Sequence, residues 1–158
     1  MKRQEKYQDT STFHYFNANP KNKVGDDCVV RAISTALHQS WEQTVRELTE
    51  VGIKYGYVLN DPHTYKRYLK DKGWIMQKQL RKEDNTKYTG DEFCKILQKD
   101  ILSVGNTVIA NIGGQHIVCI KETDDMLGLH KIHDIWDCTD YCIGNYWIKQ
   151  DGEGKIYE

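Results

Sequence analysis

The 158-residue sequence has no excess of charge of one sign and no long hydrophobic run. Lys and Arg total 22 against 23 Asp and Glu, which gives a formal net charge of −1 at pH 7. Such a chain has no global field that would attract nucleic acid or an anionic membrane. No stretch approaches the ~18 apolar residues of a membrane-spanning helix, and the polar N-terminal residues lack the apolar centre of a signal peptide. We therefore expect a cytoplasmic protein with no nucleic acid or membrane partner.

The sequence also lacks a glycine-rich phosphate loop, an internal repeat and a Cys-x-x-Cys knuckle. An odd number of cysteines without a signal peptide argues against a disulfide framework, so we expect reduced thiols. The five are Cys28, Cys94, Cys119, Cys138 and Cys142. Zinc is the rival chemistry, because Cys138 and Cys142, with Cys119 and His133, supply four suitable ligands. Without a tight knuckle, we expect no metal and no cofactor.

The order of the patterns predicts one α+β domain. Helix-type periodicity comes first, at about 28–37, 40–55, 61–73 and 89–97. Four β-rich runs follow at 107–112, 115–120, 129–135 and 143–148, with turns short enough for an antiparallel meander. We expect a flexible N-terminus over residues 1–12 and a single domain over 13–158, in which the N-terminal helices pack on a C-terminal antiparallel β-sheet.

Cys28 is the first candidate functional residue. Apolar residues recur at helical spacing from Cys28 to Leu37, and Gly25, Asp26 and Asp27 lead into this segment. A thiol at a helix N-terminus lies among unpaired backbone N–H groups and the positive end of the helix dipole, which favour the thiolate nucleophile. The alternative is a buried free cysteine that acts as a small hydrophobe.

Two residues in the β-rich half can complete a nucleophilic site with Cys28. His116 follows Gly113 and Gly114 in an apolar run, and Asp134 ends a later one. Cys, His and Asp in this order suggest a nucleophile, a base and the acid that orients the base. His133 competes as the base, but it neighbours Asp134 in a strand and points to the opposite face. Asp137 competes as the acid, although it also suits a turn cap.

Two further residues have candidate roles around this triad. The Cys28 backbone N–H can stabilise a developing oxyanion, and the Asn22 side-chain amide can supply a second donor. The alternative for Asn22 is an ordinary turn residue. Trp136 can shield the bond between His116 and Asp134 from water, or it can be a core residue.

Four stretches together resemble a family of small phage and prophage proteins of Firmicutes, which look like members of the papain-like cysteine peptidase superfamily. The stretches are Gly25-Asp-Asp-Cys28-Val-Val-Arg-Ala-Ile, Gln115-His116-Ile-Val, His133-Asp134-Ile-Trp-Asp137-Cys and Tyr146-Trp147. The resemblance implies that Cys28, His116 and Asp134 are the triad positions. It also implies a papain-like fold, in which a helix carries the nucleophile against an antiparallel sheet that carries His and Asp. The family pattern usually has one Asp between Gly and Cys, whereas this chain has two.

These observations predict a cysteine peptidase-like hydrolase that cleaves an amide or related acyl bond through Cys28, His116 and Asp134. The resemblance implies a phage or prophage protein, located in the host cytoplasm if phage encoded, that acts on a protein or peptide substrate of the host or the phage. The alternative is a non-catalytic module that binds a peptide or small ligand in the same cleft, for instance to counter host defence. Cell-wall amidase activity is a third reading, which would usually require a wall-binding module.

Overall fold

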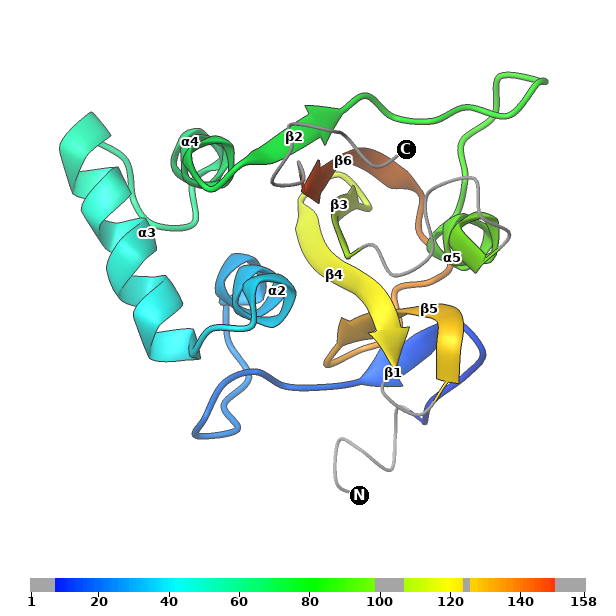
Figure 1. Ribbon diagram of the computed structural model, residues 1–158, viewed down its shortest axis with the longest axis horizontal. Helices are drawn as coiled ribbons and strands as arrows, with labels where there is room; N and C mark the ends of the chain where they lie inside the picture. The colour runs from blue at the N-terminus through cyan, green and yellow to red at the C-terminus, as the bar shows by residue number, and fades with distance from the viewer. Residues whose placement is uncertain (1–7, 99–106, 124–125, 150–158) are drawn as a thin grey trace.

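The computed structural model describes residues 8–98, 107–123 and 126–149. In these residues the fold is α+β, with four helices and one six-stranded mixed sheet (Figure 1). The helices are α2 (Cys28–Leu37), α3 (Trp41–Tyr55), α4 (Pro62–Asp71) and α5 (Gly90–Gln98). The strands are β1 (Phe13–Tyr15), β2 (Trp74–Gln77), β3 (Val108–Ile112), β4 (His116–Thr123), β5 (Met126–Asp134) and β6 (Ile143–Lys149). The α+β prediction is therefore confirmed.

The sheet differs from the predicted antiparallel meander in two ways. Its strand order is β1-β5-β4-β3-β6-β2, so β3, β4 and β5 form the expected antiparallel meander, but β6 pairs with β3 at the other side of it. Two short strands also lie at the edges of the sheet, outside the predicted meander: β1 pairs parallel to β5, which makes the sheet mixed, and β2 pairs antiparallel to β6. Both differences come from contacts between segments far apart in sequence, which local turn patterns do not encode.

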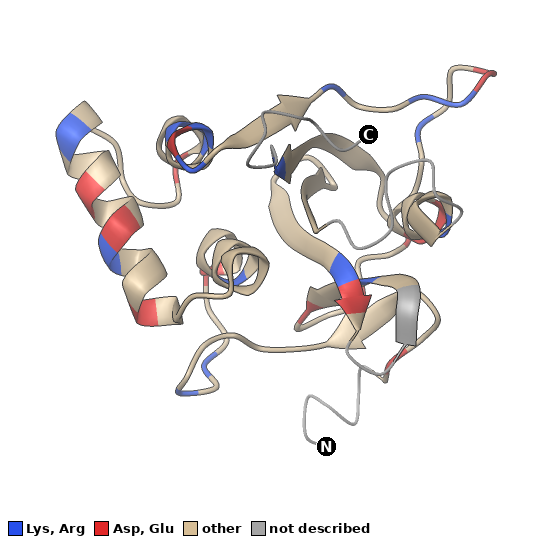
Figure 2. Ribbon diagram, viewed as in Figure 1, with Lys and Arg blue, Asp and Glu red and all other residues tan. Residues whose placement is uncertain are grey.

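Helices cover both faces of the sheet (Figure 1). On one face α2, α3 and α4 pack over a core that includes Ile33, Leu69 and Trp147. On the other face α5 covers a second core that includes Phe93 and Ile120. Figure 2 shows that charged residues gather on the outer helices and loops, while the centre of the sheet carries few. This arrangement holds α2 directly against β4.

Three of the described helices, α3, α4 and α5, begin where capping residues predict. The Ser40 hydroxyl accepts a hydrogen bond from the Gln43 N–H at 3.0 Å, and the Asp61 carboxylate caps α4 ahead of Pro62. At α5, Thr89 and Glu92 exchange backbone-to-side-chain hydrogen bonds in a capping box. No helix among the described residues has the length and apolar character that spanning a membrane requires.

The N-terminal segment that was expected to be flexible lies partly outside the described residues. Within the described part, Thr12 is buried, and its hydroxyl donates to Asp91 at 2.6 Å. The Thr12 carbonyl accepts a hydrogen bond from the Ile132 N–H. Residue 12 is thus held against both α5 and β5.

Gly52 lies where α3 meets the segment that follows it. A Cβ at this position would lie 2.2 Å from the Tyr57 carbonyl oxygen, because the chain folds back and both Gly56 and Tyr57 donate N–H groups to the Gly52 carbonyl. At an exposed position inside a helix, replacing Gly by Ala stabilises the helix by roughly 1 kcal/mol.

We expect the opposite for Gly52→Ala, a loss of about 1–3 kcal/mol in the free energy of unfolding, because backbone must move to relieve the overlap. Urea unfolding measures this change. Gly25→Ala is the control, since nothing lies within 4 Å of a Cβ there. A neutral or stabilising Gly52→Ala would contradict the prediction.

Candidate active site

Cys28 is the first residue of α2, as the sequence predicted. Its thiol is partly buried, and it is hydrogen-bonded to the His116 side chain and to the Ile117 backbone N–H. Cys28 also packs against the core between α2 and the sheet. The helix start therefore presents its sulfur to the first residues of β4.

His116 is the first residue of β4, directly after a tight turn. Gly113 and Gly114 in this turn have φ values of +64° and +91°, which side-chain-bearing residues rarely adopt. A Cβ on Gly113 would lie 3.3 Å from the Tyr141 ring, so the glycine also permits a close approach. The turn places the imidazole at the end of the sheet, beside the thiol.

Asp134, the last residue of β5, accepts a hydrogen bond from His116 Nε2 at 2.5 Å. Its other oxygen, Oδ1, accepts from Arg31 Nη1 at 2.6 Å and from the Ile135 N–H at 2.8 Å. The Cys138 thiol lies 3.9 Å from Oδ2. Donors thus surround both oxygens of a carboxylate that is only 3% exposed, so its hydrogen-bonding capacity is used within the site. Because Asp134 holds Nε2, Nδ1 is the ring nitrogen left for Cys28.

The pKa values of Cys28 and His116 shift in opposite directions. Burial alone would raise the pKa of the Cys28 thiol, but hydrogen bonds from His116 and Ile117, with the charges of His116 and Arg31, hold it below the ordinary value. Burial opposes the charged imidazole, yet hydrogen bonds to Asp134, Cys138 and Cys28 raise the pKa of His116 to about 11. Each group stabilises the charged form of the other, so the site favours a thiolate beside an imidazolium more than either group would alone.

Trp136 covers the imidazole, with ring centroids 5.1 Å apart and a tilt of 37°. It forms an edge contact with Tyr141, and both line a cavity of about 300 Å³ that reaches His116. Sequence analysis predicted that Trp136 lies over the bond between His116 and Asp134 or in the core. The tryptophan therefore forms an aromatic wall beside the base.

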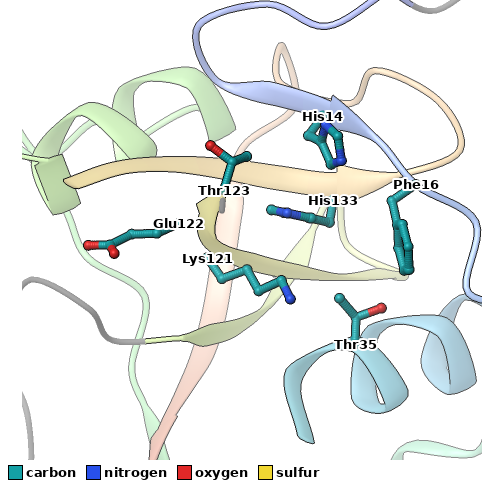
Figure 3. A pocket seen from close by; sticks show the side chains of 7 residues that line it. All are labelled: His14, Phe16, Thr35, Lys121, Glu122, Thr123 and His133. Carbon is teal, nitrogen blue, oxygen red and sulfur yellow. The ribbon is translucent and has the colours of Figure 1, made fainter. Parts of the chain in front are cut away.

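The structure separates the competing residues from this cluster. The Asp137 carboxylate accepts from the Thr139 N–H at 3.0 Å and the Thr139 hydroxyl at 2.6 Å, as a turn cap does. His133 points to the other face of β5, into a cavity of about 310 Å³ that also contains His14 and Phe16 (Figure 3). Burial, with the charges of His14 and Lys121, lowers the pKa of His133 to about 4.

Asn22 lies in an exposed turn with φ +53°, and its side-chain oxygen accepts a hydrogen bond from Asn17. The structure does not bring this side chain into the hydrogen-bonded cluster of the triad, and its oxyanion role stays a prediction. Asn19 is the asparagine of this loop that contacts the helix start, because its amide donates to Asp27 at 3.4 Å.

Two residues of the cluster had no role in the triad predicted from the sequence. Arg31 is buried in α2 and contacts both Asp27 and Asp134. Its signal is a single charged residue among small and apolar neighbours, four positions after an acid. Cys138 had been considered as a zinc ligand, and no local pattern places it against His116. Burial and the charge of Asp134 raise the pKa of its thiol.

The zinc ligands considered from the sequence are not brought together. Cys119 and Cys138 belong to the cores on opposite faces of the sheet, and Cys142 is exposed. A different set, His116, Asp134 and Cys138, offers donor atoms within 4.8 Å of one another. Tetrahedral zinc would separate its nitrogen and oxygen ligands by about 3.3 Å. The 2.5 Å separation of Nε2 and Oδ2 fits a hydrogen bond better.

The site thus combines a partly buried thiol, an imidazole that contacts it, and a buried acid that fixes the imidazole. In such an arrangement the thiol can attack an electrophilic carbon, and the neighbouring imidazole can transfer a proton to or from the reacting group. In comparisons with known proteins, no family model, no curated protein and no solved structure matches the chain.

Proposed function

We propose that the chain is a cysteine hydrolase of the papain-like kind, which cleaves an amide or related acyl bond in a protein or peptide. The observation that carries the proposal is the unbroken chain of contacts from Cys28 through His116 to Asp134. A helix carries the nucleophile, and strand ends of the sheet carry the base and the acid. The phage or prophage setting rests on the sequence resemblance.

The reaction follows from the protonation states of the pair. The Cys28 sulfur attacks the carbonyl carbon, a C–S bond forms, and negative charge develops on oxygen. When this intermediate collapses, the C–N bond breaks and His116 gives its proton to the leaving amine. Water then adds to the thioester, His116 takes a proton from that water, and the C–S bond breaks to restore the thiolate. Asp134 holds the imidazole in place and stabilises its positive charge.

The backbone N–H of Cys28, at the start of α2, is the proposed donor to the developing oxyanion, and Asn22 remains the predicted second donor. Two cavities that touch the Gly113–Gly114 turn offer room for substrate. One, of about 300 Å³, lies beside His116 and Trp136. The other, of about 390 Å³, is lined by Tyr65, Asn111 and Trp147 among others. Because His116 must reach the leaving group, we assign the first cavity to the leaving-group side.

A generic acyl donor tests this proposal without knowledge of the natural substrate. With 4-nitrophenyl acetate, we expect rapid release of nitrophenolate and an acetyl thioester that peptide mass spectrometry locates at Cys28. Cys28→Ala should lose the rapid phase, while Cys142→Ala, which removes an exposed thiol, should keep it. A rapid phase that persists in Cys28→Ala would overturn the proposal.

The second candidate is a binding module that uses the cavity beside His116 without chemistry. The cavity beside His116 favours it, since such a space can hold a small ligand or a peptide side chain whether or not the thiol reacts. The two candidates differ in the reactivity of Cys28. A thiol no more reactive than the others, in a folded protein, would favour the binding module.

A further inference from the structure

Arg31 is a charged residue in the apolar face of α2. Only 6% of the residue is exposed, and it lies three positions after Cys28, so both residues lie on the same side of the helix. Ion pairs buried in this way seldom add net stability over a well-packed apolar side chain of similar size. Stability alone is therefore a weak reason for a guanidinium at this position.

The contacts of Arg31 join the start of α2 to the acid of the candidate triad. Its Nε donates to Asp27 Oδ1 at 2.9 Å, and its Nη1 donates to Asp134 Oδ1 at 2.6 Å. Asp27 is held in turn by the Trp41 indole N–H at 3.0 Å. This explains why Asp27, although it precedes the helix, makes no side-chain cap. The planar fork of arginine can meet two carboxylates in fixed directions, which a lysine ammonium cannot.

Charges alternate along the chain of contacts. It runs from the Asp27 carboxylate to the Arg31 guanidinium, the Asp134 carboxylate and the His116 imidazolium, and it ends at the Cys28 thiolate. Within the described residues, the titratable and charged groups whose charges act with the Cys28 thiol include His116 of β4, Arg31 of α2 and Tyr65 of α4. Among these, Arg31 contacts the acid and also lies on the helix of the nucleophile.

We propose that Arg31 is a positioning residue, which fixes the Asp134 carboxylate relative to Cys28 so that His116 is held between them. The proposal rests on the proposed function, because it assigns Arg31 a part in preparing the same thiolate. One turn of α2 then sets the separation between the nucleophile and the acid. The charge of Arg31 also favours the thiolate, so its loss affects the ionisation of Cys28 as well as the geometry.

Alkylation of Cys28 by iodoacetamide as a function of pH, with Cys142 as the internal reference, tests the proposal. In Arg31→Gln we expect the reactivity of Cys28 relative to Cys142 at pH 6 to fall about tenfold, and its acid limb to move to higher pH by about one unit. Arg31→Lys keeps the positive charge but can reach only one of the two carboxylates. We therefore expect a smaller shift of the acid limb than in Arg31→Gln, together with a reduced rate of Cys28 alkylation. The matched control is Arg67→Gln, because exposed Arg67 pairs with Asp71 at the same i,i+4 spacing as the Asp27–Arg31 pair, and it should change neither quantity.

Thermal unfolding of each variant separates positioning from support of the fold. A purely structural role would lower the melting temperature without moving the pH profile of the folded protein. A folded Arg31→Gln with the wild-type profile would overturn the inference, and if that variant does not fold, a wild-type profile and rate in Arg31→Lys would do so. If the wild type itself shows no advantage for Cys28, the proposed function fails. An advantage in the wild type that both Arg31 variants keep removes only the inference.

Discussion

Iodoacetamide is expected to alkylate Cys28 about 10 to 100 times faster than Cys142 at pH 6. The thiolate is the reactive species, and an ordinary cysteine with a pKa of 9.0 holds about one thiolate in a thousand at that pH. His116 and Ile117 lower the pKa of Cys28 by hydrogen bonds to its sulfur. The alkylation rate increases by less than the thiolate fraction does, because the nucleophilicity of a thiolate falls as its pKa falls.

The two thiols form a demanding internal comparison. Cys142 is exposed and Cys28 is partly buried, so access alone would make Cys142 the faster. Peptide mass spectrometry after short exposures to the reagent measures both rates in one sample. The acid limb of the Cys28 profile should lie below the ordinary thiol value, and a second change should lie near pH 11, where His116 loses its proton.

His116→Ala removes the partner that stabilises the thiolate. Burial then dominates, and it raises the pKa of Cys28, so the advantage at pH 6 should disappear while the rates of the other thiols stay unchanged. His133→Ala is the matched control, since that imidazole lies in the cavity on the other face of β5 (Figure 3). Equal rates for Cys28 and Cys142 in the wild type, or an effect of His133→Ala as large as that of His116→Ala, would contradict the prediction.

Local chemistry explains why so much of the helical half could be predicted. Ser40 and Asp61 are capping residues, and α2 runs from Cys28 to Leu37, the range that the apolar spacing indicates. Each of these signals lies within a few residues of the feature that it specifies. The proximity of His116 to Asp134 also follows from sequence, because adjacent antiparallel strands β4 and β5 bring the two residues to one end of the sheet.

The features that sequence analysis missed depend on contacts between distant segments. The pairing of β6 with β3 follows from the packing of the whole sheet, and turn length did not reveal it. Arg31 meets Asp134 across 103 positions, and only the charge inside an apolar helix hinted at such a partner. The exposed turn of Asn22 could be predicted, but which asparagine approaches the helix start depends on loop geometry.

Asp134→Ala is expected to lower the free energy of unfolding by about 3 to 5 kcal/mol, because it leaves the buried Arg31 guanidinium without one of its two carboxylates. His116 loses the acid that holds its Nε2 in the same variant. Urea unfolding at pH 7 measures the stability, and alkylation by iodoacetamide measures the reactivity of Cys28 relative to Cys142. Asp134→Asn keeps an oxygen for Arg31, so it should cost less, about 1.5 to 3 kcal/mol. Its amide has no charge to stabilise the imidazolium, so the advantage of Cys28 at pH 6 should still fall.

Asp137→Ala separates the two acids that the sequence left in competition. Asp137 caps a turn through Thr139, so its loss should cost about 1 kcal/mol and leave the pH profile of Cys28 unchanged. A pH profile of Cys28 that changes in Asp137→Ala but stays unchanged in Asp134→Asn would reassign the orienting acid to Asp137.

The two Asp134 variants separate the contribution of this side chain to stability from the contribution of its charge. If this carboxylate only stabilised the fold, Asp134→Asn would keep much of the stability and much of the reactivity of Cys28. An acid that stabilises the imidazolium must be charged. The amide variant should therefore lose Cys28 reactivity even where the fold survives.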